Sequence, residues 1–240
     1  MIGALTFLTV LGPRRHSQQP GSSGFAWFWL VGGGIGFILA GVWLALSAVA
    51  GPGVAALIVV TVDLALTGML HFDGLADSAD GLIAPMDRQR RLEIMRKPDI
   101  GAFGVCVLVI CLMGRWVGLQ EGGFNPLILV AVWSMSRAIA ATIPGFVSYA
   151  RSDGGLASAF LPGATRWLGL SLIPAIVLAL ATNPIVGAVS IVALMAGALS
   201  VLVLARHQIG GFTGDVLGAV IVVSETAALL AAAGASGANQ

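Results

Sequence analysis

Long apolar segments, separated by short polar connectors, run through almost the whole chain. A helix needs about 20 apolar residues to cross the hydrocarbon core of a bilayer, with tolerance down to about 17. The connectors carry Gly, Pro and Asn, the residues typical of turns. The pattern therefore predicts seven membrane-spanning helices, at Phe25–Val49, Val54–Leu70, Ala102–Leu119, Leu127–Ile143, Trp167–Ala181, Ile185–Leu204 and Asp215–Ala233.

The composition supports lipid as the surrounding medium. Of the 240 residues, 58% are hydrophobic and only 10% are charged, whereas a soluble domain carries about 25% charged residues. The net charge of +1 gives no reason to expect nucleic-acid binding. We therefore expect an all-α, polytopic membrane protein in which residues 1–240 form a single integral membrane domain.

The basic residues predict the orientation of this domain. When the connectors are assigned alternately to the two sides, ten of the 12 Lys and Arg residues fall on the side of the N-terminus and none falls in a connector on the other side. Cytoplasmic loops carry such an excess, so the N-terminus is predicted to be cytoplasmic and the C-terminus external. The ten are Arg14, Arg15, Arg88, Arg90, Arg91, Arg96, Lys97, Arg151, Arg166 and Arg206.

One polar segment, His71–Gly81, begins where the second predicted helix reaches the cytoplasmic side. It places Asp73, Asp77 and Asp80 at positions i, i+4 and i+7, along one face of a helix. No Lys or Arg lies between these carboxylates, so a divalent cation is a natural partner. Mg²⁺ suits oxygen ligands and leaves coordination positions for substrate phosphates. The alternative is a solvated acidic turn after a membrane helix.

Further candidates surround this acid cluster. Basic residues of the same predicted cytoplasmic segment, 71–101, suit a phosphate-rich ligand, although the positive-inside signal accounts for some of them. Asp63 and Glu225 fall inside predicted membrane helices, where acids are functional candidates. The alternative is that both are buried partners of Arg115 or Arg137. His71 adjoins the acids and could be a ligand, a base or an interfacial cap.

At these residues the sequence resembles the cobalamin synthase family of membrane-bound adenosylcobinamide-GDP ribazoletransferases. Four blocks carry the resemblance, and they follow the family's order along the chain. They are Thr67–Leu82, Arg91–Gly104, Ser136–Ala138 with Tyr149–Gly154, and Gly210–Ala219 with Glu225. The first two blocks are very specific. The family's N-terminal Thr-Arg-x-Pro element is present only loosely, at Thr9–Arg14.

The resemblance implies Mg²⁺-dependent joining of adenosylcobinamide-GDP to α-ribazole or its 5′-phosphate, with release of GMP. It implies an enzyme of the inner, cytoplasmic membrane whose partners are these substrates and membrane lipid, with no nucleic acid; a homo-oligomer stays open. The predicted metal ligands are Asp73, Asp77 and Asp80. The predicted catalytic residues are His71, Asp77, Asp63 and Glu225, and the predicted substrate-binding residues are Arg91, Arg96, Lys97, Arg137, Arg151 and Asp215.

Two other classes of protein remain as alternatives. A CDP-alcohol phosphotransferase uses similar Asp-rich helix chemistry, but its signature places Ala-Arg after Asp-Gly-x-x, and here Ala76 is followed by Asp77. A cation transporter would explain Asp63, Glu225 and the abundance of Gly. It would not explain a long polar cytoplasmic segment that carries most of the acids.

Overall fold

The computed structural model describes residues 1–12, 22–123, 125–151 and 166–237, and confirms that the fold is all-helical. Within these ranges no β-strand forms, and only an isolated bridge joins Tyr149 to Phe212. The short 3₁₀ helices are η1 (Ser22–Trp27), η2 (Ile143–Gly145) and η4 (Arg166–Ser171). The α-helices are α1 (Ile2–Leu8), α2 (Phe28–Ala50), α3 (Pro52–Thr67), α4 (Leu70–Leu82), α5 (Arg88–Ile94), α6 (Ala102–Gln120), α7 (Leu127–Thr142), α8 (Leu172–Thr182), α9 (Pro184–Ile209) and α10 (Gly214–Gly237).

Five of the described helical segments are long and apolar enough to cross a membrane, and a sixth is counted if α3 and α4 form one bent span. The protein is therefore a multi-pass membrane protein, but the predicted count of seven spans is not confirmed. The predicted span Val54–Leu70 ends early, because Gly68 and Met69 both adopt positive φ angles, of 59° and 60°. The chain bends there by 90° between α3 and α4. The predicted span Trp167–Ala181 is divided between the 3₁₀ helix η4 and the 11-residue helix α8, and is too short to count as a span.

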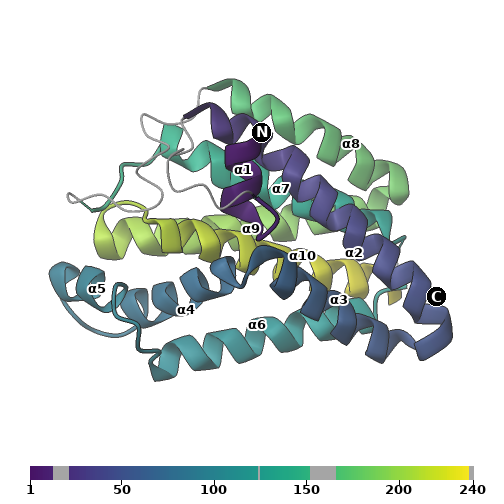
Figure 1. The fold of residues 1–240 in the computed structure, drawn as a ribbon, viewed down its shortest axis with the longest axis horizontal. Helices are drawn as coiled ribbons and strands as arrows, with labels where there is room; N and C mark the ends of the chain where they lie inside the picture. The colour runs from purple at the N-terminus through teal and green to yellow at the C-terminus, as the bar shows by residue number, and fades with distance from the viewer. Residues whose placement is uncertain (13–21, 124, 152–165, 238–240) are drawn as a thin grey trace.

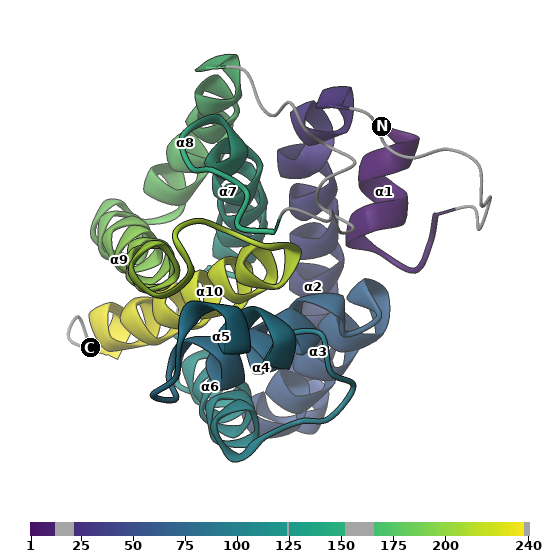
Figure 2. The same ribbon diagram turned by 90° about the vertical axis from the view of Figure 1, so that its left-hand side faces the viewer.

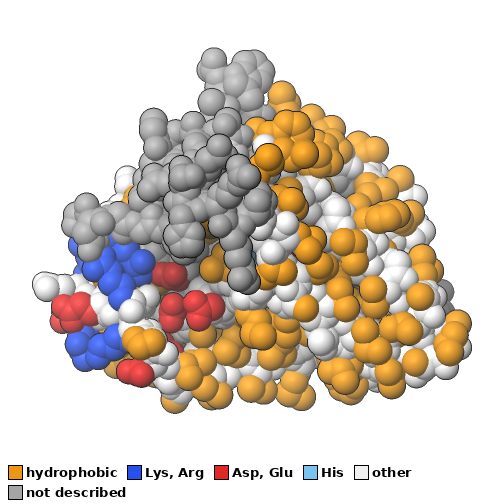
Figure 3. All heavy atoms as spheres, viewed as in Figure 1, with side chains coloured by type: hydrophobic (Ala, Val, Ile, Leu, Met, Phe, Trp, Pro, Cys, Tyr) orange, Lys and Arg blue, Asp and Glu red, His pale blue; other side chains and the backbone are white. Residues whose placement is uncertain are grey.

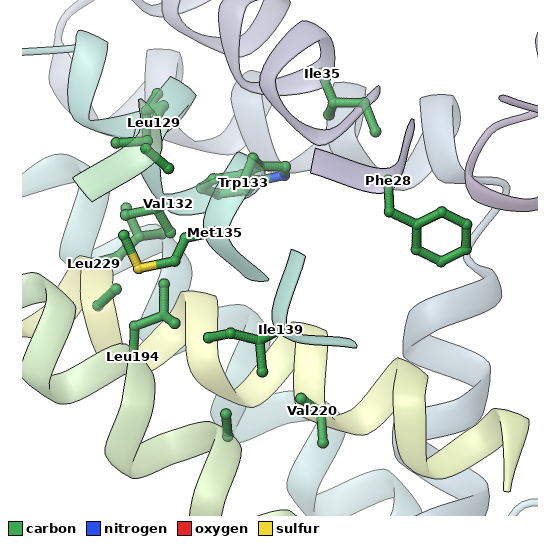
Figure 4. Packing of buried hydrophobic residues seen from close by; sticks show 14 of the residues in the cluster. Phe28, Ile35, Leu129, Val132, Trp133, Met135, Ile139, Leu194, Val220 and Leu229 are labelled. Carbon is green, nitrogen blue, oxygen red and sulfur yellow. The ribbon is translucent and has the colours of Figure 1, made fainter. Parts of the chain in front are cut away.

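Helices α7 and α10 form the centre of the bundle, with the other long helices around them (Figures 1 and 2). Most residues of α7 and α10 are buried, whereas α2, α6 and α9 bury only about a quarter of theirs. Val132 and Met135 of α7 pack with Leu194 of α9 and Leu229 of α10 in one continuous core (Figure 4). The outer helices therefore present their remaining apolar surface to lipid.

Charged side chains gather at one end of the molecule, near α4 and α5, while hydrophobic side chains are spread over the rest of the described surface in view (Figure 3). The C-terminal end of α10 lies toward the opposite end (Figure 1). Of the basic residues that predict the orientation, Arg14, Arg15 and the side chain of Arg166 lie outside the described residues, as do Ser152–Gly154 of the third block. The charged end is where a polar substrate can approach the bundle.

Candidate functional site

Helix α4 lies directly against the first turns of α10, and two glycines allow this close contact. A Cβ atom on Gly74 of α4 would come within 2.8 Å of the Asp215 carbonyl oxygen, and one on Gly218 of α10 within 3.0 Å of the His71 carbonyl oxygen. Any larger residue at either position would push the two backbones apart. The two glycines therefore bring the acidic face of α4 next to Asp215.

This contact gathers three carboxylates. Asp73 is exposed and Asp77 is half-buried. Burial, and then the neighbouring charges of Asp215 and Asp73, raise the pKa of Asp77 to about 7. Asp215 is thus part of the acid cluster, although it is more than 130 residues further along the chain. A cation among these carboxylates would relieve their mutual repulsion.

Arg151 partly neutralises the cluster and connects it to the α5–α6 connector. Its Nη2 donates to Asp215 Oδ2 at 2.8 Å and to the Met95 carbonyl oxygen at 3.3 Å. The segment before it is held by the bridge between Tyr149 and Phe212, because the Phe212 N–H donates to the Ser148 carbonyl and the Ala150 N–H donates to the Phe212 carbonyl. Arg151 and Asp215, both predicted to bind substrate, therefore contact each other in the structure.

The third predicted metal ligand, Asp80, faces away from this cluster. Its two carboxylate oxygens accept hydrogen bonds from the Gly101 N–H at 2.7 Å and the Gly104 N–H at 2.9 Å, at the start of α6. Asp80 is buried, and it satisfies two of the N–H groups that a helix N-terminus leaves without partners. In the structure Asp80 therefore acts as a cap of α6.

This assignment predicts that Asp80→Ala lowers stability through the loss of the cap. A lost cap costs about 1 kcal/mol, and the charge and burial of this one place it toward the upper end of a range of about 0.5–2 kcal/mol. Thermal unfolding in detergent, with Asp87→Ala at the cap of the short exposed helix α5 as comparison, measures the difference. An unchanged melting temperature for Asp80→Ala would show that the cap contributes nothing.

The basic residues of the 71–101 segment differ in their contacts. Arg88 donates to the carbonyl oxygens of Ile209 and Ala150, and Arg90 pairs with Glu93. Arg91 is buried, and its Nη1 donates to the carbonyl oxygens of Gly81, Leu82 and Ala84, so it caps the C-terminal end of α4. Arg96 and Lys97, in contrast, are exposed and line a cleft together with Asp73 and Asp77. Arg96 and Lys97 are therefore the basic side chains of this segment that can meet a ligand bound to Asp73 and Asp77.

Two hollow spaces meet at Asp73. The outer cleft, of about 410 Å³, is lined mainly by polar residues: Asp73, Asp77, Arg96, Lys97 and Asp99. The inner cavity, of about 140 Å³, is more enclosed and lies between α4, α10 and the Tyr149–Arg151 segment. Asp73 lines both spaces, so the two spaces lie next to each other.

A second charged cluster lies in the interior of the bundle. Arg115 donates to Asp63 and to Glu225, each at 2.5 Å, and Arg137 pairs with Glu225. Trp133 Nε1 also donates to Asp63 Oδ1 at 2.9 Å. All four charged side chains are almost fully buried. Of the two interpretations of Asp63 and Glu225 offered by the sequence, the structure agrees with the one in which they are buried partners of Arg115 and Arg137.

The interior cluster supports the acid cluster through Phe72. The guanidinium of Arg115 lies over the Phe72 ring, 4.9 Å from its centroid, and Phe72 stands between His71 and Asp73 on α4. The cluster joins side chains of α3, α6, α7 and α10 and so fixes the helices on which α4 rests. Asp63, Glu225 and Arg137 line neither the outer cleft nor the inner cavity.

The described residues contain no group of three or more His, Cys, Asp or Glu side chains that could hold a metal ion. The predicted set Asp73, Asp77 and Asp80 is therefore not preassembled, since Asp80 is directed to α6. Mg²⁺ is usually held by one or two carboxylates together with substrate phosphates. Asp73 and Asp77, in a cleft beside two basic residues, meet that requirement without a third carboxylate.

Sequence reasoning missed several residues of this region. Phe7 and Phe28 line the inner cavity, and so does Tyr149, which stands in a family block but was given no role from the sequence. The aromatic residues lie in three separate segments, and no local pattern connects them.

Comparisons with known proteins agree with the resemblance seen in the sequence. The family model described as cobalamin-5-phosphate synthase matches residues 1–233. An adenosylcobinamide-GDP ribazoletransferase of Azorhizobium caulinodans is 41% identical over 84% of this chain and 80% of its own length. One of Bradyrhizobium diazoefficiens is 40% identical over 76% and 71%, and one of Chlorobium phaeovibrioides is 35% identical over 97% and 96%. No solved structure matches the chain.

The match covers all the described helices except the last four residues of α10, and it includes both the acid cluster and the interior charged cluster. Identity with these relatives exceeds 30% over more than two thirds of the chain. The chain therefore belongs to the cobalamin-5-phosphate synthase family.

Proposed function

We propose that this protein is an adenosylcobinamide-GDP ribazoletransferase, which joins adenosylcobinamide-GDP to α-ribazole or its 5′-phosphate and releases GMP. The observation that carries the proposal is the outer cleft, where Asp73 and Asp77 face Arg96 and Lys97 at the charged end of a membrane bundle. Carboxylates for a metal and basic groups for phosphate are what a diphosphate substrate requires. Family membership supplies the identity of the substrates.

In the reaction, a ribose hydroxyl of α-ribazole attacks the phosphorus next to the corrinoid. A new P–O bond forms, the P–O–P bond breaks, and GMP leaves with the bridging oxygen. A Mg²⁺ ion held by Asp73 and Asp77 would supply charge neutralisation at the diphosphate. Arg96 and Lys97 are placed to bind the phosphate oxygens and the departing GMP.

The hydroxyl proton requires an acceptor at the junction of the two spaces. Asp73 and His71 both line the inner cavity, and Asp77 lies one helical turn from Asp73. These three are the candidates for the general base. Asp63 and Glu225 are too deeply buried among their arginine partners to meet the substrate, so we assign them the role of positioning α4.

Product formation tests the proposal. Purified protein in lipid nanodiscs, given adenosylcobinamide-GDP, α-ribazole and Mg²⁺, should release GMP and a cobalamin in equal amounts. Omission of either substrate, or chelation of the metal, should abolish both GMP release and cobalamin formation. If cytidine nucleotides and alcohols are turned over instead, the protein is a CDP-alcohol phosphotransferase.

In the proposed orientation the N-terminus is cytoplasmic, and the outer cleft faces the cytoplasm. We expect a cysteine introduced as Asp87→Cys to resist an impermeant thiol reagent in intact cells and to react after lysis. Gly122→Cys, in the connector at the other end of α6, should react in intact cells. Cys106 is exposed, so both changes belong in a Cys106→Ala background. The reverse labelling pattern would invert the orientation.

A further inference from the structure

The inner cavity has the size and walls of a site for one flat ring system. Its volume is about 140 Å³; Phe7, Phe28 and Tyr149 contribute aromatic side chains to its lining, and Asp73, Arg151 and Asp215 contribute charged ones. An enclosed apolar cavity of about 150 Å³ is large enough to hold benzene. A corrin macrocycle carrying a nucleotide is many times larger, so the cavity excludes it.

A buried polar atom in the cavity wall has no partner in the structure. His71 is only 4% exposed, and its Nε2 makes no hydrogen bond to any described residue. Burying such an atom without a partner is unfavourable, because the atom loses its hydrogen bonds to water. His71 lines the inner cavity, so a polar group of a ligand placed there would satisfy it.

The position of the cavity relative to the outer cleft completes the argument. The outer cleft, with Arg96 and Lys97, suits the diphosphate, and its volume of about 410 Å³ exceeds that of the inner cavity. A transfer reaction needs the second substrate to reach the same phosphorus from another direction. Asp73 is the residue that the two spaces share, and the inner cavity offers the second approach.

We propose that the inner cavity binds the acceptor α-ribazole, with its heteroaromatic base among Phe7, Phe28 and Tyr149 and a polar group on His71 Nε2. The ribose then lies at the mouth, where its hydroxyl meets the phosphorus beside Asp73. This assignment rests on the proposed function and adds the division of the site into a donor cleft and an acceptor cavity.

Separate binding measurements for the two spaces test the assignment. Titration calorimetry on the full protein in nanodiscs measures two dissociation constants. The Kd for α-ribazole reports on the inner cavity, and the Kd for GDP with Mg²⁺ reports on the outer cleft. Phe7→Ala removes an aromatic wall from a partly exposed helix, and the Kd for α-ribazole should rise about tenfold, as expected for a lost stacking partner. Ala140→Leu places a larger side chain from α7 in the cavity, and the Kd for α-ribazole should rise further. The Kd for GDP should change less than twofold in both.

Phe103→Ala is the matched control, because Phe103 lies on α6 outside both spaces, and it should leave both dissociation constants unchanged. Turnover gives a second readout: in Phe7→Ala the KM for α-ribazole should rise while that for adenosylcobinamide-GDP stays constant. Unchanged α-ribazole affinity in both Phe7→Ala and Ala140→Leu overturns the assignment, even if the wild type is fully active. A wild type that binds α-ribazole but releases no GMP overturns the proposed function instead.

Discussion

Asp77→Asn should lower the rate of GMP release by about 100-fold or more, while the protein still inserts and folds. The substitution keeps the shape of the side chain and removes a negative charge from the outer cleft. Because Asp77 lies close to Asp73 and Asp215, losing its charge relieves repulsion in the metal-free protein, and stability should not fall. Initial rates across a Mg²⁺ titration, together with thermal unfolding, measure both effects.

Asp73→Asn should have a similar effect, with part of the rate recovered at high Mg²⁺ or with Mn²⁺. Glu93→Gln is the charge-matched control, since Glu93 is exposed on α5, pairs with Arg90, and lines neither space. It should keep the rate of the wild type. If Asp77→Asn retains the wild-type rate at limiting Mg²⁺, the outer cleft is not where the metal acts.

Arg115→Met should be the most destabilising single change in the bundle. It leaves Asp63 without its only arginine partner among the described residues, in a site that water does not reach. Breaking a buried ion pair by removing one member costs about 3–5 kcal/mol, because the other charge stays buried without compensation. We expect a large drop in the melting temperature and in the yield of monodisperse protein.

The double variant Arg115→Met with Asp63→Asn distinguishes a structural role from a catalytic one. It removes the uncompensated charge, so much of the lost stability should return, and the coupling energy should be large. If Asp63→Asn alone keeps its melting temperature but loses activity as strongly as Asp77→Asn, Asp63 takes part in catalysis, as the sequence first suggested.

The sequence predicted the parts of this architecture that depend on local pattern. Apolar length predicted the helices, and the spacing of Asp73 and Asp77 predicted the shared face of α4. The same spacing also predicted Asp80 as a ligand, but the orientation of that side chain depends on the Gly101 and Gly104 N–H groups of α6. Periodicity shows which face a residue occupies and cannot show which neighbouring element it meets.

The remaining differences also come from tertiary contacts. Arg91 is one of several basic residues in the 71–101 segment. Only the folded chain shows that its guanidinium donates hydrogen bonds to the carbonyl oxygens at the end of α4. The second predicted span was drawn through Gly68 and Met69, where the left-handed backbone turns the chain by 90°. Asp215 joins the acid cluster because Gly74 and Gly218 let two distant helices touch, which no linear motif records.

The path of an isotopic label tests the central claim most directly. Adenosylcobinamide-GDP carrying ³²P only in the phosphate next to the corrinoid is incubated with α-ribazole, Mg²⁺ and the purified protein. Attack at that phosphorus, bound in the cleft of Asp73 and Asp77, predicts that all of the label enters the cobalamin product and that the released GMP is unlabelled. Label in the guanine nucleotide, or a product that forms without loss of GMP, would contradict the account.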